Sequence, residues 1–320
     1  MRLTELDGSR LEAAVDLFAA AYAIERESTS SLPEHPLGGP DPLRAEVASV
    51  LRRGGVAAVD RGRLIGYMCA GFSFPFKGLR AGLCPVIGHA AEAGREDEVY
   101  PALYAAVGCI WAQRGDAIHV VEHLAHDRAL ERLLYALGFG MIVCERVCEL
   151  SALEVSCRHE VVRADAASLA AIDAEHASYY RASPIFVHKE TDPASIVADL
   201  REIEGAGCVF LACLHGGEPI GYCAGGPQSH PEGLLLRNTN SAQLRTAYVR
   251  QPYRGTGVGR ALLGAAVAHA RDAGFDRIFV EHETANTSGS TFWARHFHPY
   301  VRFSMRYVDL GPLRGGTEQV

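Results

Sequence analysis

The fold of this chain is decided by the stretch Tyr248-Val249-Arg250-Gln251-Pro252-Tyr253-Arg254-Gly255-Thr256-Gly257-Val258-Gly259-Arg260-Ala261-Leu262-Leu263. A β-rich run ends at Val249, and Pro252 then stops strand pairing. Glycines alternate at positions 255, 257 and 259, and a helical apolar spacing begins directly after them. Gly274 is suited to end that helix. The stretch therefore predicts a strand, a glycine-rich turn and a helix.

A turn of this kind is suited to an anion. Glycines let the backbone approach a ligand closely. The first N–H groups of a helix have no partner inside the helix and lie at its positive end, so they attract phosphate. Arg254 and Arg260 add positive charge on either side of the glycines. A plain connection that binds nothing is the alternative interpretation.

Two other phosphate-binding classes fit the turn less well. A P-loop requires GxxxxGK[ST], and the sequence contains no such string. A dinucleotide-binding turn requires GxGxxG, but counting from Gly255 the third glycine is replaced by Arg260. Redox chemistry with a dinucleotide is therefore the weaker interpretation.

The string Arg254-x-x-Gly257-x-Gly259 resembles the [Q/R]-x-x-G-x-[G/A] loop of the GNAT superfamily of N-acetyltransferases. Downstream, Asn286 followed by Phe292-Trp293 and Phe297 resembles the N…FYxxxGF segment of that family. The resemblance covers roughly residues 208–308. It implies acetyl-CoA as the co-substrate and an amine of a small molecule or peptide as the acceptor.

The resemblance also implies which residues bind acetyl-CoA. The pantetheine and the thioester would be faced by Ala247, Tyr248 and Val249. The pyrophosphate would be bound by Arg254, Gly255, Thr256, Gly257, Val258, Gly259 and Arg260. The rest of the CoA arm would be bordered by Asn286, Phe292 and Trp293.

Acetyl transfer to an amine requires a proton acceptor for the amine and a donor for the leaving thiolate. The predicted strand over 244–249 carries no carboxylate, but the next strand offers Glu281, His282 and Glu283. The alternation of a strand places Glu281 and Glu283 on one side and His282 on the other. These three residues are the candidates for the catalytic base.

The candidate acid is harder to assign. The family often has a tyrosine seven residues after the asparagine, where this chain has Trp293, which cannot donate a proton as an acid. The alternatives are His296, His298 and Tyr300, or a thiolate that leaves unassisted. Direct transfer in a ternary complex is the prediction, and a non-catalytic protein that binds or senses acyl-CoA is the alternative.

The chain repeats itself in outline. Leu64–Gly71 reappears as Pro219–Gly226, and Ile118–His123 is echoed by Ile278–His282, with offsets close to 155 and 160 positions. Two echoes in the same order suggest a duplication. The predicted fold class is α/β (α+β), with two tandem GNAT-like domains, each a mixed, mostly antiparallel sheet flanked by helices. The predicted boundaries are 1–150 and 156–311, with a tail over 312–320.

Three local expectations accompany this fold. A first helix is expected over about 9–27 with Ser9 as its N-cap, a strand near Leu83–His89, and a late helix over Ser290–His296.

The first domain departs from the phosphate-binding pattern. At the corresponding turn it reads Ala93-Gly94-Arg95-Glu96-Asp97-Glu98-Val99, with one glycine and three acids. Acids at this position would repel a pyrophosphate. We therefore expect a degenerate domain that supports the other one.

The string His119-Val120-Val121-Glu122-His123 has the spacing of an H-x-x-E-H zinc motif. That motif requires a helix, and this segment reads as a strand, which sets the histidines roughly 13 Å apart. No metal site is therefore expected.

Composition sets the remaining limits. Of the 320 residues 48% are hydrophobic and 22% charged, and the net charge of −7 argues against nucleic-acid binding. The nine cysteines form no CxxC pair, which favours free thiols in a reducing compartment. No signal sequence and no apolar run of membrane-spanning length is visible, so we expect a cytoplasmic monomer or homodimer without a membrane partner.

Overall fold

The computed structural model describes residues 1–153, 159–189, 191–228 and 232–311. The chain divides into two compact units. Unit 1 contains residues 1–144 and the segment from Pro299 onward, and unit 2 contains Glu145–His298. These packing units differ from the predicted sequence domains in the last strand, because most of that strand belongs to unit 1.

The first half of the chain forms four helices and eight strands, and the last of these strands, β8, continues into unit 2. They are β1 (Arg2–Glu5), α1 (Leu11–Ser28), α2 (Pro40–Leu51), β2 (Gly55–Asp60), β3 (Arg63–Cys69), β4 (Phe72–Phe76), β5 (Leu79–Cys84), β6 (His89–Ala91), α3 (Glu96–Gln113), β7 (Ile118–Leu124), α4 (Arg128–Ala136) and β8 (Gly140–Glu149). One sheet has the order β1-β2-β3-β6, and β5 pairs with β4 and β7.

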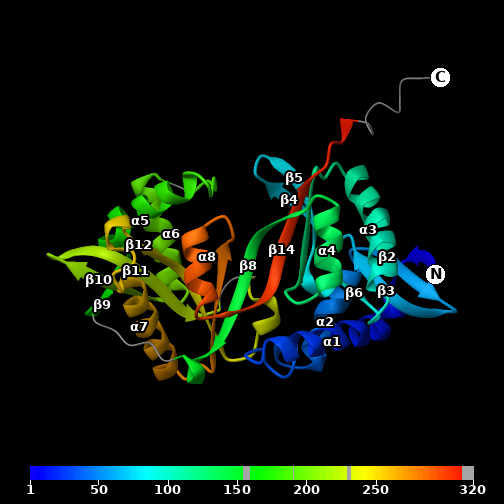
Figure 1. Ribbon diagram of the computed structural model, residues 1–320, viewed down its shortest axis with the longest axis horizontal. Coiled ribbons are helices and arrows are strands. Elements are labelled where there is room, and N and C mark those ends of the chain that lie inside the picture. The colour runs from blue at the N-terminus through cyan, green and yellow to red at the C-terminus, as the bar shows by residue number, and fades with distance from the viewer. Residues whose placement is uncertain (154–158, 190, 229–231, 312–320) are drawn as a thin grey trace. The chain divides into compact units, whose positions relative to one another are not determined.

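The second half of the chain repeats this order of elements without a counterpart of the β4–β5 hairpin, and its final strand lies mostly in unit 1 (Figure 1). The elements are β9 (Val161–Ala164), α5 (Ala166–Arg181), α6 (Pro193–Gly205), β10 (Val209–His215), β11 (Glu218–Pro227), β12 (Ser241–Val249), α7 (Val258–Asp272), β13 (Arg277–Glu283), α8 (Thr287–Ala294) and β14 (His298–Tyr307). Strands β9 to β12 pair antiparallel in chain order, and β12 pairs parallel with β13. The predicted fold class, with mixed and mostly antiparallel sheets flanked by helices, is confirmed.

The sheet of unit 2 is buried on both faces. Cys223 packs in the cluster formed with α7, whereas its neighbours Tyr222 and Ala224 pack in the cluster formed with α5 and α6. This alternation follows from the period of two along a strand. In Figure 1, α7 accordingly covers one face of β10 to β12, and α5 and α6 cover the other.

Two of the three local expectations need correction, and the expected late helix begins at a different residue. The strand expected near Leu83–His89 is two strands, β5 and β6, because Pro85 is followed by a short 3-10 turn at Val86–Gly88. Ser9 is not an N-cap. Instead, the carboxylate of Asp7 accepts a hydrogen bond from the Ser9 amide and caps a 3-10 turn that leads into α1. The late helix begins at Thr287 rather than Ser290.

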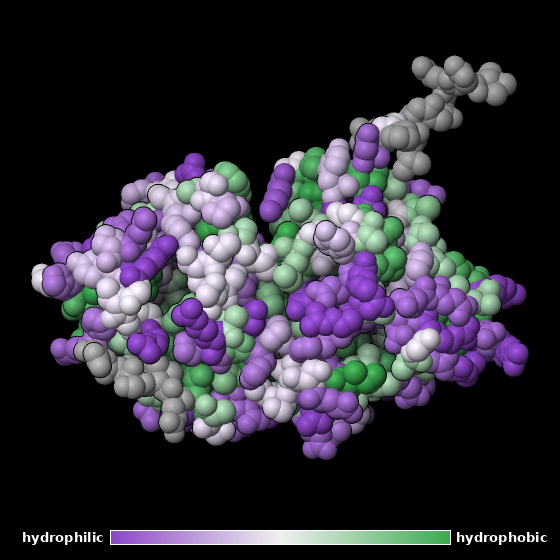
Figure 2. All heavy atoms as spheres, viewed as in Figure 1, coloured by the Kyte–Doolittle hydropathy of each residue, from purple (hydrophilic) through white to green (hydrophobic). Residues whose placement is uncertain are grey.

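Hydrophilic side chains cover much of the visible surface of each unit (Figure 2). The eight cysteines in the described parts of the chain are free thiols, and seven of them are buried. No helix within the described residues is long and apolar enough to cross a membrane.

Candidate active site

The central feature of unit 2 is a gap between β12 and β13. The two strands pair from Ser241 opposite Arg277 to Leu244 opposite Val280, and the pairing ends there although both strands continue. On its other side β12 pairs with β11, and the register shifts so that Arg245 is an extra residue on β12. Such a bulge bends a strand. The bend turns β12 away from β13, and a wedge opens between them.

A cavity of about 890 Å³ occupies this wedge. Its volume is in the range of small-molecule sites. Most of the residues predicted from the sequence line it, and these are Ala247, Tyr248, Val249, Arg254, Gly255, Gly257, Gly259, Arg260, Glu281, His282, Asn286, Phe292 and Trp293. Thr256, Val258 and Glu283 do not line the cavity.

The glycine-rich turn forms one end of the cavity. Gly257 is the N-cap of α7 with φ +101°, in the left-handed region that favours glycine, and its lack of a side chain leaves no side-chain cap on the helix. The first turn of α7 carries no acidic residue. A Cβ atom on Gly259 would lie 3.4 Å from the ring of Phe292, at ordinary contact distance, so the turn lies directly beside α8. Val258, by contrast, is fully buried and anchors the turn in the core.

Positive charge gathers near the turn. Arg254, Arg260 and Arg295 all line the cavity. The guanidinium of Arg254 lies 4.2 Å from the ring centroid of Tyr179, and its Nε donates to the carbonyl of Val249 at 3.0 Å. These contacts hold Arg254 against the end of β12.

Aromatic side chains of α5 form another wall. The ring of His176 stacks on Tyr248 with centroids 5.0 Å apart, and Tyr179 and Tyr180 follow on the same helix and line the cavity. The hydroxyl of Tyr179 donates to Oδ1 of Asn286 at 2.9 Å. The same oxygen accepts the amide of Gly289 at 3.0 Å, which caps α8. Asn286 therefore joins α5 to α8 through one side chain.

A buried polar network supports this wall. The hydroxyl of Tyr222 on β11 hydrogen-bonds to Asp173, lies 3.1 Å from Nδ1 of His176, and lies 3.3 Å from Oγ1 of Thr246. Burial lowers the pKa of His176 to about 4, so the ring is neutral at pH 7. Burial would raise the pKa of Asp173, but hydrogen bonds from His176 and Tyr222 outweigh it and lower that pKa. A role for Asp173 and Tyr222 could not be predicted from the sequence, because α5 and β11 meet only after folding.

The three candidate bases on β13 have different surroundings. Glu281 lines the cavity and is half-buried. His282 is 5% exposed, its Nε2 accepts a hydrogen bond from Nε of Arg146 at 3.1 Å, and its Nδ1 lies 3.3 Å from the carbonyl of Glu283. Burial lowers the pKa of His282 to about 4. A ring with both nitrogens engaged and this pKa is poorly suited to accept a proton, so the geometry favours Glu281.

The candidate acids also separate. His296 lines the cavity, but burial and the charges of Arg260 and Arg295 lower its pKa, so it is neutral at pH 7. His298 is exposed, Tyr300 is fully buried in unit 1, and neither lines the cavity. Trp293 packs edge-on against Phe292 and Phe297. The tyrosines that line the cavity all belong to its aromatic wall, and they are Tyr179, Tyr180 and Tyr248.

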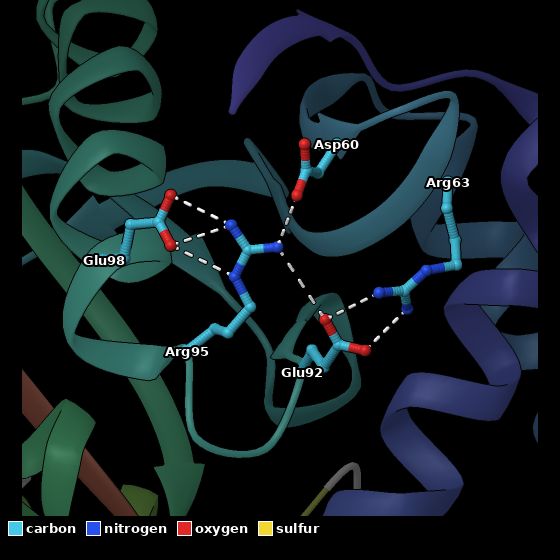
Figure 3. A network of polar contacts seen from close by, with 5 residues as sticks. All are labelled: Asp60, Arg63, Glu92, Arg95 and Glu98. Atoms are coloured by element: carbon cyan, nitrogen blue, oxygen red, sulfur yellow. Dashed lines mark hydrogen bonds and ion pairs between the residues drawn. The ribbon is translucent and has the colours of Figure 1, made fainter.

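The corresponding turn of unit 1 contains paired charges instead (Figure 3). Arg95 is the N-cap residue of α3, and its guanidinium pairs with Glu98 at 2.8 Å and with Asp60 at 2.9 Å. Arg63 pairs with Glu92 at 2.6 Å. Hydrogen bonds from Arg95 and Arg63 lower the pKa of Asp60 and Glu92, respectively, so both carboxylates are charged at pH 7.

The region between β6 and β7 in unit 1 is filled by its own side chains. Nε2 of His89 lies 2.7 Å from the carbonyl of Glu122, and the amide of Val86 donates to the Glu122 carboxylate at 3.1 Å. The hydroxyl of Tyr67 donates to the carbonyl of Ile87 at 2.9 Å. His89, Tyr67 and Ile87 are each at most 4% exposed. The H-x-x-E-H string of this unit lies on β7, as its interpretation as a strand requires.

Comparisons with known proteins agree with this geometry. Residues 171–298 match the model of the acetyltransferase (GNAT) family. These residues lie within unit 2, which therefore resembles a GNAT domain. A match to an aminoglycoside N(6')-acetyltransferase type 1 of Stenotrophomonas maltophilia has 38% identity over 87 residues, 25% of this chain and 50% of that enzyme. The chain thus spans about half the length of this curated relative.

Solved structures extend the likeness in fold to both units. A GCN5-related N-acetyltransferase from Sphaerobacter thermophilus superposes with a TM-score of 0.59 at 14% identity, covering 95% of each chain. A tandem GNAT protein from the clavulanic acid biosynthesis pathway superposes with a TM-score of 0.54 at 15% identity, covering 97% of this chain and 99% of that one. The chain therefore has the tandem GNAT fold.

Proposed function

We propose that the GNAT domain of unit 2 binds acetyl-CoA in the wedge and transfers the acetyl group to a primary amine by direct attack in a ternary complex. The observation that carries this proposal is the end of β12–β13 pairing at Leu244 and Val280. It leaves one cavity that runs from the glycine-rich turn to Glu281.

The residues present fit acetyl-CoA. The N-terminus of α7, with no acid in its first turn, and the nearby arginines suit a pyrophosphate. Beyond Leu244, β12 has no strand partner on the β13 side, so its backbone groups there are suited to hydrogen-bond the amides of a pantetheine arm. A backbone N–H near Tyr248 or Val249 would stabilise a developing oxyanion.

The bound thioester would supply the acetyl group, and the side chains of the wedge would manage the protons. Glu281, which lines the cavity, would accept the proton of the amine directly or through water. His282, held by Arg146, would position β13. A phenol of the aromatic wall would donate the proton to the leaving thiolate, in place of the tyrosine that Trp293 replaces.

Unit 1 would not bind acetyl-CoA. Its helix α3 has three acids in the first turn, and the guanidinium of Arg95 beside them is already paired with Asp60, Glu92 and Glu98, so this turn is poorly suited to a phosphate. Its strand gap is filled by buried side chains, His89 among them. We therefore propose a degenerate domain that leaves one acetyl-CoA site per chain.

Turnover tests the proposal. The purified chain is incubated with acetyl-CoA and a panel of amines, including aminoglycosides because of the S. maltophilia relative, and the released thiol and acetylated product are measured. Product with any amine, lost in Glu281→Gln, supports the transferase. Acetyl-CoA binding without product from any amine would instead favour the non-catalytic sensing protein.

A further inference from the structure

The chain is unusual in its basic residues. Of 31 lysines and arginines only two are lysines, Lys77 and Lys189. Lys77 is an exposed residue of the β4–β5 turn in unit 1, with its Nζ 5.3 Å from the ring centroid of Phe76. Lys189 lies in unit 2 and lines the wedge cavity. One of the two lysines therefore borders the proposed acetyl-transfer site.

Contacts place Lys189 beside the aromatic wall of that cavity. Its Nζ lies 4.5 Å from the ring centroid of Tyr180 on α5. One turn earlier on the same helix, His176 stacks on Tyr248 of β12. Tyr248 is one of the residues that would face the thioester. The Lys189 amine thus shares one aromatic wall with the β12 segment that would bind the reacting group.

The surroundings of Lys189 favour an amine that reacts. Burial lowers its pKa, although the charges of Asp173, Glu283 and Asp199 oppose that shift. A lower pKa increases the neutral fraction of the amine, and only the neutral amine is a nucleophile. The exposed Lys77 lies in a turn of unit 1 and does not line the wedge cavity.

We propose that Lys189 is a self-acetylation site, modified within its own chain by the GNAT domain that carries it. This inference rests on the proposed acetyl-CoA site. The ammonium of Lys189 first gives one proton to water. The neutral Nζ then attacks the thioester carbonyl carbon, an N–C bond forms and the C–S bond breaks. The second proton of Nζ goes to the sulfur, so CoA leaves as the thiol.

The modification would affect the binding of the acceptor amine. An acetylated Lys189 has no positive charge, so it loses the cation–π contact with Tyr180, and its added acetyl group occupies the cavity. The modified chain would bind acetyl-CoA but react more slowly with amines. Acetylation of Lys189 would thus inhibit amine acetylation when acetyl-CoA is present and the acceptor is scarce.

The experiment uses the full chain with acetyl-CoA and no added amine. Calorimetry first establishes acetyl-CoA binding on the same preparation, and peptide mass spectrometry then follows acetylation of Lys189, Lys77 and the N-terminal amine over time. Lys77 is the internal control for non-enzymatic acetylation. The variants are Lys189→Arg, Lys77→Arg, and Gly257→Glu, which places a carboxylate in the glycine-rich turn.

We expect Lys189 to be acetylated about tenfold or more faster than Lys77. The rate per chain should be independent of protein concentration, lost in Gly257→Glu and unchanged in Lys77→Arg. Acetyl-CoA binding with equal labelling of the two lysines, or a rate that rises with protein concentration, would overturn self-acetylation and leave the proposed function intact. A wild-type chain that does not bind acetyl-CoA would overturn both.

Discussion

Glu281 and His282 are neighbours on β13, but their partners give them different chemistry. Both line the cavity, but Glu281 is half-buried, whereas His282 is buried and has both ring nitrogens engaged. We expect Glu281→Gln to lower kcat by about 10²–10⁴-fold, the usual contribution of a general base. His282→Gln, which keeps an acceptor for Arg146, and Glu283→Gln should change kcat by less than about tenfold.

Steady-state kinetics with the amine found to react would measure these effects, and calorimetry would show that all three variants still bind acetyl-CoA. A larger loss in His282→Gln than in Glu281→Gln would assign the base to the histidine instead.

Residue types and spacing alone could predict part of this site. The turn at 254–260 and Asn286 are local motifs, and apart from Thr256 and Val258 they line one cavity. The stacking of His176 on Tyr248 could not be predicted in the same way, because the two residues meet only through tertiary packing. The sequence showed Lys189 only as one of two lysines in the chain. That scarcity of lysine became informative once the structure placed Lys189 at the cavity.

At the scale of the elements, the wedge depends on β12 losing one partner and keeping the other. Residues 242–244 pair with both β11 and β13, whereas 246–249 pair with β11 alone. We expect backbone amides of 245–249 that face the gap to exchange with solvent faster than those of 242–244. Acetyl-CoA should slow that exchange because it would supply the missing hydrogen-bond partners.

Hydrogen–deuterium exchange resolved to single amides, with and without acetyl-CoA, would check this. The amides of β2 in unit 1 serve as the control segment, and they should exchange at the same rate in both samples. Equal protection along the whole of β12 in the free chain would contradict the wedge.

Elements with a clear apolar period were predicted well from the sequence, as α7 illustrates with its start at Val258 directly after the glycines and its end at Asp272 shortly before Gly274. The errors occurred where one residue redirects the chain. Pro85 and the following 3-10 turn divide an apolar run into β5 and β6, and Asn286 starts α8 earlier than the apolar pattern does. The β4–β5 hairpin was not predicted, and its first strand contains Pro75, which is unusual inside a strand.

At the scale of the whole molecule, buried histidines should make stability depend on pH. Burial lowers the pKa of His119, His123, His176 and His282 to about 4, below the ordinary value of 6.5. Between those values the unfolded chain binds protons that the folded chain does not, so stability falls as pH drops from about 6.5 toward 4. Each histidine contributes at most about 1.4 kcal/mol per pH unit. Burial raises the pKa of Glu25, which acts in the opposite direction.

Denaturant unfolding at a series of pH values would measure this slope. His123→Gln should reduce it, because one titrating group is removed from the core of unit 1. A free energy of unfolding that stays constant between pH 7 and 4.5 would show that these histidines keep ordinary pKa values.

The central claim is a single acetyl-CoA site at the glycine-rich turn of unit 2. Calorimetric titration with acetyl-CoA tests it on the wild type, Gly257→Glu and the matched control Gly94→Glu. Both glycines have positive φ, +101° and +82°, so both variants carry a similar backbone strain, about 1–2 kcal/mol. We predict one site per chain in the wild type and in Gly94→Glu, and no binding in Gly257→Glu. Two sites per chain, or loss of binding in Gly94→Glu with Gly257→Glu unaffected, would contradict it.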